Sequence, residues 1–102
     1  MGWEFVLEAG ALAAGQCHGT EVGGEYVAVY NLDGRFFATS DICTHQVALL
    51  SGGRIEGDCI ECPMHQGRFH IPTGAPRAEP ATEALKTYPV KVENDKVYVF
   101  VE

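Results

Sequence analysis

Two short motifs in the middle of the chain decide its fold: CTH at Cys43–His45 and CPMH at Cys62–His65. Sixteen residues separate the histidine of the first motif from the cysteine of the second. Each motif offers one thiolate and one imidazole, so the two together offer two sulfur and two nitrogen ligands. Such a donor set suits a zinc ion or an iron–sulfur cluster. The motifs therefore predict a metal centre built from two loops.

The region around the motifs, residues 41–80, differs from both ends of the chain. It holds three of the four cysteines and three of the four histidines, is rich in glycine and proline, and shows little strand pattern. A long irregular stretch inside a compact domain usually serves function. We therefore expect residues 41–80 to be irregular and to form the binding part of the molecule.

Short segments rich in β-branched and aromatic residues lie on both sides of this region. The clearest are Tyr26–Tyr30, Arg35–Ala38, Leu85–Val92 and Lys96–Val101. Asp33-Gly34 and Glu93–Asp95 lie between consecutive segments, and such sequences form hairpin turns. Pro89 has no N–H for a sheet ladder, so we expect it at an edge or a bulge. Only Ala9–Ala14 could form a turn or two of helix, which favours an all-β fold of small antiparallel sheets.

Length and charge limit what the chain can do. Its 102 residues suffice for one domain, residues 1–102, with a modest core. Fourteen acidic against seven basic residues give a net charge of −7, which disfavours binding to nucleic acids and anionic lipids. No apolar run is long enough for a membrane span, and the start of the chain lacks the features of a signal peptide. We expect a cytoplasmic protein whose reduced cysteines serve ligation or packing.

The residues alone leave other uses of the cysteines and histidines open. A structural zinc ion could take the same four ligands, or it could use a C-x-x-C motif at Cys59–Cys62. A thioredoxin-like use of that motif lacks the surrounding βαβ pattern. We expect Cys17 and Cys59 to be packing residues, and His18 and His70 to be surface or structural imidazoles.

Longer stretches around the motifs resemble a known family. Cys62–Phe69 (CPMHQGRF), followed by Thr73-Gly74, is similar to the second cluster loop of Rieske ferredoxins, and Leu85–Glu93 (LKTYPVKVE) is similar to their tail. The resemblance covers nearly the whole chain, and it is to the ferredoxins of bacterial aromatic-ring-hydroxylating dioxygenase systems. It implies the Rieske fold, an all-β fold of small antiparallel sheets. In that fold a β-sandwich-like base carries a two-loop cluster-binding subdomain, here at about residues 41–80.

The resemblance also implies a cofactor and its ligands. One [2Fe-2S] cluster would have one iron held by Cys43 and Cys62, and the other held by His45 and His65. Neutral imidazoles leave their iron less electron-rich than thiolates do. That iron should therefore accept the electron, at a higher potential than in ferredoxins with four cysteine ligands.

The function that the resemblance implies is one-electron transport. The chain would accept electrons from an NAD(P)H-dependent flavoprotein reductase and pass them to a terminal aromatic-ring-hydroxylating oxygenase, and it would not itself be an enzyme. We expect a monomer that contacts both partners transiently around His45 and His65, with its acidic charge aiding encounter. A chain of this length has no room for the mononuclear-iron domain of the oxygenase itself.

Four positions separate the chain from high-potential Rieske proteins. Those relatives carry an additional, disulfide-forming cysteine in each loop, and the matching residues here are Ala48 and Met64. Their loop serine and tyrosine, whose hydroxyls hydrogen-bond the cluster sulfur and a ligand thiolate, are replaced by Gly67 and Phe69. The loss of these hydroxyls should lower the potential to the low end of the Rieske range, roughly −150 mV.

Two further expectations concern the loops themselves. Gln46 stands where these ferredoxins often have glycine, which leaves the shape of the first loop open. Thr73–Pro76 is expected to form a third wall over the cluster, as the proline-containing loop of the family does.

Overall fold

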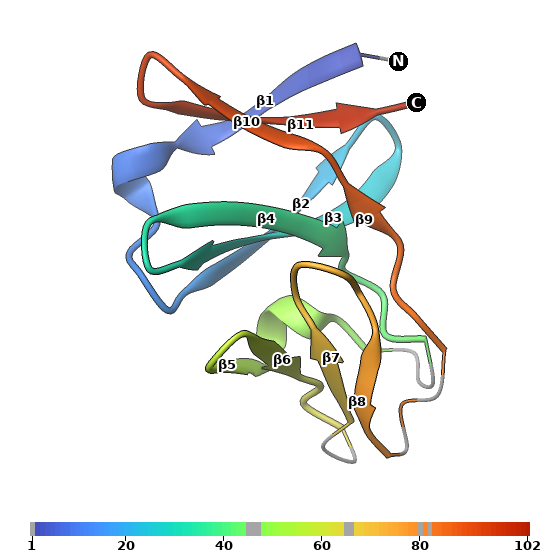
Figure 1. The fold of residues 1–102 in the computed structure, drawn as a ribbon. Coiled ribbons are helices and arrows are strands. Elements are labelled where there is room, and N and C mark those ends of the chain that lie inside the picture. The colour runs from blue at the N-terminus through green and yellow to red at the C-terminus, as the bar shows by residue number, and fades with distance from the viewer. Residues whose placement is uncertain (1, 45–47, 65–66, 80, 82) are drawn as a thin grey trace.

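A computed structural model describes residues 2–44, 48–64, 67–79, 81 and 83–102, and these residues form three antiparallel sheets (Figure 1). The only helical elements among them are two 3-10 turns, η1 (Ala9–Ala11) and η2 (Leu50–Gly52). The strands are β1 (Gly2–Glu8), β2 (Cys17–Val22), β3 (Glu25–Leu32), β4 (Arg35–Ser40), β5 (Arg54–Glu56), β6 (Cys59–Glu61), β7 (Arg68–His70), β8 (Pro76–Ala78), β9 (Thr87–Tyr88), β10 (Val90–Glu93) and β11 (Lys96–Val101). The expected all-β fold is confirmed, and the described part of the chain holds no helix that could cross a membrane.

Two of the sheets form the base of the molecule, with strand orders β1-β11-β10 and β2-β3-β4-β9. Alternation along β11 turns Val97, Val99 and Val101 inward, where they are fully or almost fully buried. They pack in one cluster with Val27 and Val29 of β3. The two sheets therefore enclose a core between them, as in a β-sandwich.

Both hairpin turns expected from the sequence are present. Asp33 and Gly34 join β3 to β4 with φ angles of 58° and 93°. Asn94 and Asp95 join β10 to β11 with φ angles of 53° and 61°. Positive φ at both central residues is the type I′ pattern, whose twist matches that of paired strands. Pro89 separates β9 from β10, which are edge strands of different sheets, so its expected edge position is also confirmed.

The third sheet, with the order β5-β6-β7-β8, lies below the base in Figure 1. Its presence shows that the irregular structure expected over residues 41–80 is wrong for the twelve residues in these four strands. Each of its strands is only three residues long, which is too short for alternation to stand out in the sequence. The central residues Ile60 and Phe69 are fully buried and join a second core cluster with Tyr30 and Leu50.

Candidate metal centre

The second cysteine motif begins at the end of the β6–β7 hairpin. Glu61 pairs with Arg68 in the last rung of the ladder, and the loop beyond that rung starts at Cys62. The Cys62 N–H donates to the carbonyl oxygen of Gly67 at 2.7 Å, which closes the loop at its base. The Cys62 side chain is 1% exposed. Sheet pairing and this one hydrogen bond hold the cysteine at the buried end of the loop.

The first cysteine motif is closed in the same way. A β-bridge pairs Ile42 with Leu49, and the Cys43 N–H donates to the carbonyl oxygen of Ala48 at 3.0 Å. In both loops a cysteine therefore bonds to the residue five positions later. Cys43 is 4% exposed.

The two loops bring Cys43 and Cys62 into a single buried cluster. They share it with Leu50, Ile60 and Phe69. Two sulfur atoms presented by separate loops in an apolar setting suit a thiophilic metal centre, because thiolates bind zinc and iron–sulfur clusters. The described donors therefore fit the expected [2Fe-2S] cluster. The other two expected ligands, His45 and His65, lie outside the described residues, as does Gln46.

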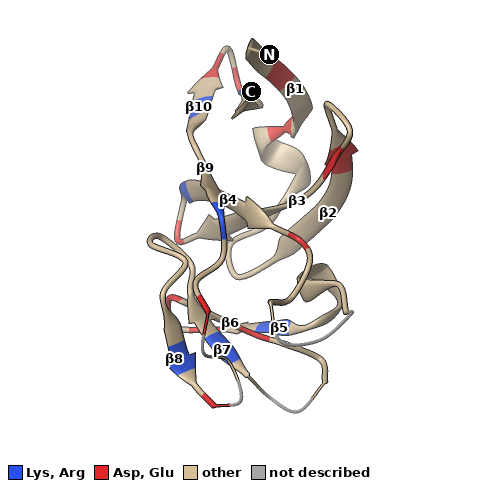
Figure 2. Ribbon diagram, turned by 90° about the vertical axis from the view of Figure 1, so that its right-hand side faces the viewer, with Lys and Arg blue, Asp and Glu red and all other residues tan. Residues whose placement is uncertain are grey.

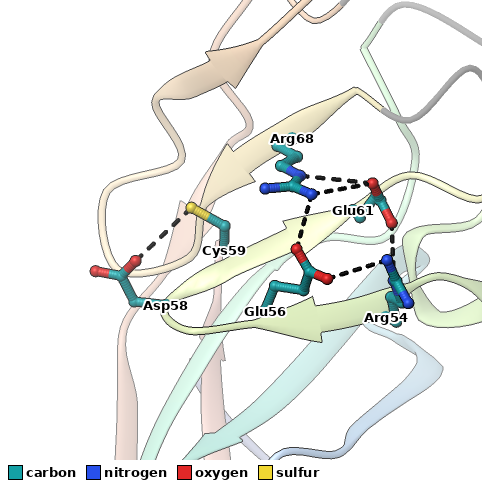
Figure 3. Close-up of polar contacts among 6 residues, drawn as sticks. All are labelled: Arg54, Glu56, Asp58, Cys59, Glu61 and Arg68. Atoms are coloured by element: carbon teal, nitrogen blue, oxygen red, sulfur yellow. Dashed lines mark hydrogen bonds and ion pairs between the residues drawn. The ribbon is translucent and has the colours of Figure 1, made fainter.

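A closed ring of four charges, Arg54, Glu56, Arg68 and Glu61, covers one face of the third sheet (Figure 3), and Glu61 directly precedes Cys62. Glu61 accepts from Arg54 Nε at 2.9 Å and lies 3.5 Å from Arg68 Nε, while Glu56 bonds Arg68 at 2.7 Å and Arg54 at 3.0 Å. The hydrogen bond from Arg54 is the main reason why the pKa of the Glu61 carboxyl is lowered. The ring has no net charge. It links β5, β6 and β7, and Cys62 directly follows β6.

The expected third wall at Thr73–Pro76 is wrong. β7 leads away from the Cys62 loop, so the turn that follows it lies at the opposite end of the third sheet (Figure 1). There, Gly74, with a φ of 78°, donates to the His70 carbonyl and accepts from the Leu85 N–H. The segment after β8 is the one that returns to the loops, because Thr44 Oγ1 donates to the Glu83 carbonyl at 2.9 Å.

The zinc site at Cys59–Cys62 does not fit the strand geometry. Cys59 begins β6 and Cys62 follows its end, so the two are about 10 Å apart along the chain and on opposite faces. Cys59 is half-buried rather than buried, and its thiol donates to Asp58 at 3.7 Å (Figure 3). Burial, followed by the charge of Asp58, raises the pKa of this thiol.

The remaining cysteine and histidines behave as expected. Cys17 packs against the cluster that holds the loop cysteines, and its thiol donates to the Ser51 carbonyl at 3.6 Å. His18 is exposed. His70 is a structural imidazole, held by Asp58 at 2.9 Å and by Thr73 at 2.7 Å.

Exposed apolar side chains surround the two loops. Ile42 is 38% exposed, Leu49 49% and Met64 45%. Ile42 directly precedes Cys43, Leu49 pairs with Ile42 in the bridge that closes the first loop, and Met64 lies two residues after Cys62. This end of the molecule therefore offers apolar surface next to the candidate centre. Grouped apolar exposure is typical of interaction sites.

The acidic residues, unlike these exposed apolar side chains, are not concentrated at the loop end. Residues 41–80 hold five acidic and three basic residues, whereas the rest of the chain holds nine and four. Figure 2 shows basic residues on β5, β7 and β8 and acidic residues on β1 and β2. Most of the net negative charge therefore belongs to the base and not to the loop end.

Comparisons with known proteins identify the family of this chain. The sequence profile of the Rieske [2Fe-2S] domain matches residues 2–89. The ferredoxin component of the naphthalene 1,2-dioxygenase system of Pseudomonas putida is 45% identical over 97 residues, which is 95% of this chain and 93% of that protein. The ferredoxin component of the naphthalene 1,2-dioxygenase/salicylate 5-hydroxylase systems of a Ralstonia species is 46% identical over 88 residues, or 86% and 85% of the two chains.

Solved structures agree with these sequence matches. The ferredoxin of carbazole 1,9a-dioxygenase from Nocardioides aromaticivorans superposes with a TM-score of 0.96 at 31% identity, and all of both chains is covered. A chain in the complex of reduced oxygenase and oxidized ferredoxin in carbazole 1,9a-dioxygenase superposes with a TM-score of 0.92 at 40% identity, covering 96% of this chain and 92% of that one. The chain belongs to the Rieske [2Fe-2S] domain family and is an electron carrier of the ferredoxin type found in aromatic dioxygenase systems.

Proposed function

We propose that this chain carries single electrons from an NAD(P)H-dependent flavoprotein reductase to a terminal aromatic-ring-hydroxylating oxygenase, as a monomer in the cytoplasm. The observation that carries the proposal is the burial of Cys43 and Cys62 in one cluster, each at the base of an identically closed loop. It is supported by relatives whose names describe ferredoxin components of dioxygenase systems.

The proposed cofactor is one [2Fe-2S] cluster per chain, held within the subdomain of residues 41–80. Cys43 and Cys62 would bind one iron, and His45 and His65 the other. When bound, such a cluster takes up and releases one electron. The chain's own contribution is to keep the two thiols buried and to fix their loops through the backbone bonds to Ala48 and Gly67.

The proposed docking surface is the loop end of the molecule. Exposed Ile42, Leu49 and Met64 offer apolar contact beside the ligand loops, which suits a small and transient interface. The charge of the base acts at longer range and favours encounter with partners of opposite potential. Apolar contact would then hold the complex briefly, while charge would speed its formation.

We also propose that the potential lies near the low end of the Rieske range, roughly −150 mV. Gly67 has no side chain, and Phe69, which is fully buried, has no hydroxyl. Neither side chain can donate a hydrogen bond to cluster sulfur or to a ligand thiolate. Such bonds stabilise the more negative, reduced state, so their absence should keep the potential low.

Reconstitution tests this function. The purified holoprotein should restore substrate oxidation to a mixture of NADH or NADPH, a flavoprotein ferredoxin reductase and a naphthalene-type terminal oxygenase. A Cys43→Ser variant should abolish that activity. Cys17→Ser should retain it, because Cys17 is not a proposed ligand and a serine hydroxyl can still donate to the Ser51 carbonyl. Equal activity of the two variants would contradict the proposal.

A further inference from the structure

A buried carboxylate lies at the neck of the first loop. Asp41 is 3% exposed. Its two oxygens accept hydrogen bonds from Ser51, one from the backbone N–H at 2.7 Å and one from the hydroxyl at 2.9 Å. The Asp41 carbonyl accepts a hydrogen bond from the Leu50 N–H at 2.7 Å, and the Asp41 N–H donates to the Tyr26 carbonyl at 2.9 Å. Asp41 and Ser51 therefore join the chain entering the loop to the chain leaving it.

A third segment, strand β2, packs over this Asp41–Ser51 pair. Gly19 lies in the middle of β2, and a Cβ atom there would overlap both the Ser51 Oγ and an Asp41 carboxylate oxygen. The bare backbone of β2 therefore packs directly over the pair. Residues from three separate parts of the sequence combine to hold one carboxylate away from water.

The charge of Asp41 is not cancelled by any ion pair among the described residues. Its hydrogen-bond donors, the Ser51 amide and hydroxyl, are neutral dipoles. The charge also acts on its surroundings: after burial itself, it is the second cause that raises the pKa of the Cys17 thiol. A negative charge in a poorly screened position thus stands two residues before Cys43.

We propose that the Asp41–Ser51 pair tunes the reduction potential of the cluster, with the Asp41 charge lowering it and the Ser51 hydroxyl moderating that effect. The inference rests on the proposed ligation by Cys43. Two residues span at most roughly 7 Å of extended chain, so the carboxylate is well within the distance at which buried charges interact. Adding an electron near a fixed negative charge is unfavourable, and a hydroxyl that donates to the carboxylate weakens the repulsion.

Potentiometric titration of the holoprotein with dithionite, followed by EPR, tests the proposal. Asp41→Asn removes the charge, while its amide can still accept from the Ser51 N–H and can donate to the Ser51 hydroxyl oxygen. We expect about a tenfold shift toward the reduced state, which is about 59 mV for one electron. Ser51→Ala should shift the ratio of reduced to oxidised cluster the other way, by about threefold, and so lower the potential. Glu4→Gln, which removes the same charge from exposed β1 in the far sheet, should leave it unchanged.

The opposite signs separate tuning by charge from simple loosening of the loop. Water admitted by a loosened loop would stabilise the reduced state in both variants, so a rise in Ser51→Ala would overturn the proposal. A potential in Asp41→Asn equal to that of Glu4→Gln would overturn it as well. If Asp41→Asn does not retain the cluster, the Ser51→Ala variant alone tests the proposal: a lower potential supports it and a higher one overturns it. A wild-type protein without a Rieske EPR signal would overturn the proposed function, and this inference with it.

Discussion

Two neighbouring glycines make a sharp test of how the loops are held. Gly53 follows η2 and lies against the end of β6, where a Cβ atom would overlap the Glu61 carbonyl oxygen. At Gly52 the nearest atom to a Cβ would be Pro63 Cγ at 3.9 Å, an ordinary contact. Neither glycine has a positive φ, so alanine strains the backbone at neither position. The two substitutions therefore differ only in the space available for the added Cβ atom. Gly53→Ala must displace the backbone that leads directly to Cys62, whereas Gly52→Ala displaces nothing.

The expected magnitude follows from the two environments. Crowding against a fixed backbone costs about 1–3 kcal/mol, whereas alanine at a permissive glycine position stabilises by about 0.4–1 kcal/mol through the unfolded chain. In a domain of this size about 1 kcal/mol shifts the Tm by about 4–8 °C. The two variants should therefore differ by about 1.4–4 kcal/mol, so we expect Gly53→Ala to melt about 6–30 °C below Gly52→Ala in circular dichroism and to retain less cluster by visible absorbance. Equal melting temperatures and equal cluster content would refute the argument.

Three further predictions address charge and potential. The hydrogen bond from Arg54, together with the charges of Arg54 and Arg68, keeps the folded-state pKa of Glu61 below its usual value. The stability from these contacts is therefore present at neutral pH and lost as the pH falls through that lowered pKa. Glu61→Gln should flatten this loss in melts between pH 7 and 3, and an unchanged slope would contradict it. The rate of electron transfer from the reductase, measured by stopped flow, should fall as the salt concentration rises from about 10 mM to about 500 mM. Salt screens the net charge of −7, which would otherwise speed the encounter of the two proteins. A constant rate would exclude electrostatic steering. Phe69→Tyr restores a loop hydroxyl and should raise the midpoint potential in voltammetry, and an equal or lower value would count against the low-potential argument.

The sequence predicts the base best where turns and alternation agree. Asp33-Gly34 and Asn94-Asp95 adopt positive φ angles that few other residue pairs accept, so their turns are visible in the sequence. β11 alternates strictly between buried valines and partly exposed aromatic residues, which makes it the clearest strand of all. Local chemistry alone determines these features.

Two strands of the base were not expected, for reasons that lie outside the local sequence. A bulge between Phe5 and Leu7 breaks the alternation of β1, and Phe5 on its outer face is 51% exposed. β2 carries the strand-breaking residue Gly19 at its centre, where the Asp41–Ser51 pair needs the space. A long-range contact therefore explains a residue that the local pattern counts against a strand.

In the loops, too, the sequence predicts the features that depend on local motifs and misses those that depend on long-range contacts. The spacing of the two motifs points to Cys43 and Cys62, which the fold brings into one cluster. The misplaced wall at Thr73–Pro76 comes from the direction of β7, which depends on pairing with β6 and leaves no local signal. Asp41 and Ser51 carry no motif, and only their mutual hydrogen bonds single them out.

The central claim is that Cys43 and Cys62 hold one [2Fe-2S] cluster together with His45 and His65. EPR and nitrogen ENDOR of the dithionite-reduced protein, combined with iron and sulfide analysis, test it most directly. We expect two irons and two sulfides per chain and a paramagnetic reduced centre coupled to two imidazole nitrogens. A colourless protein that contains zinc, or a reduced cluster without nitrogen coupling, would contradict it.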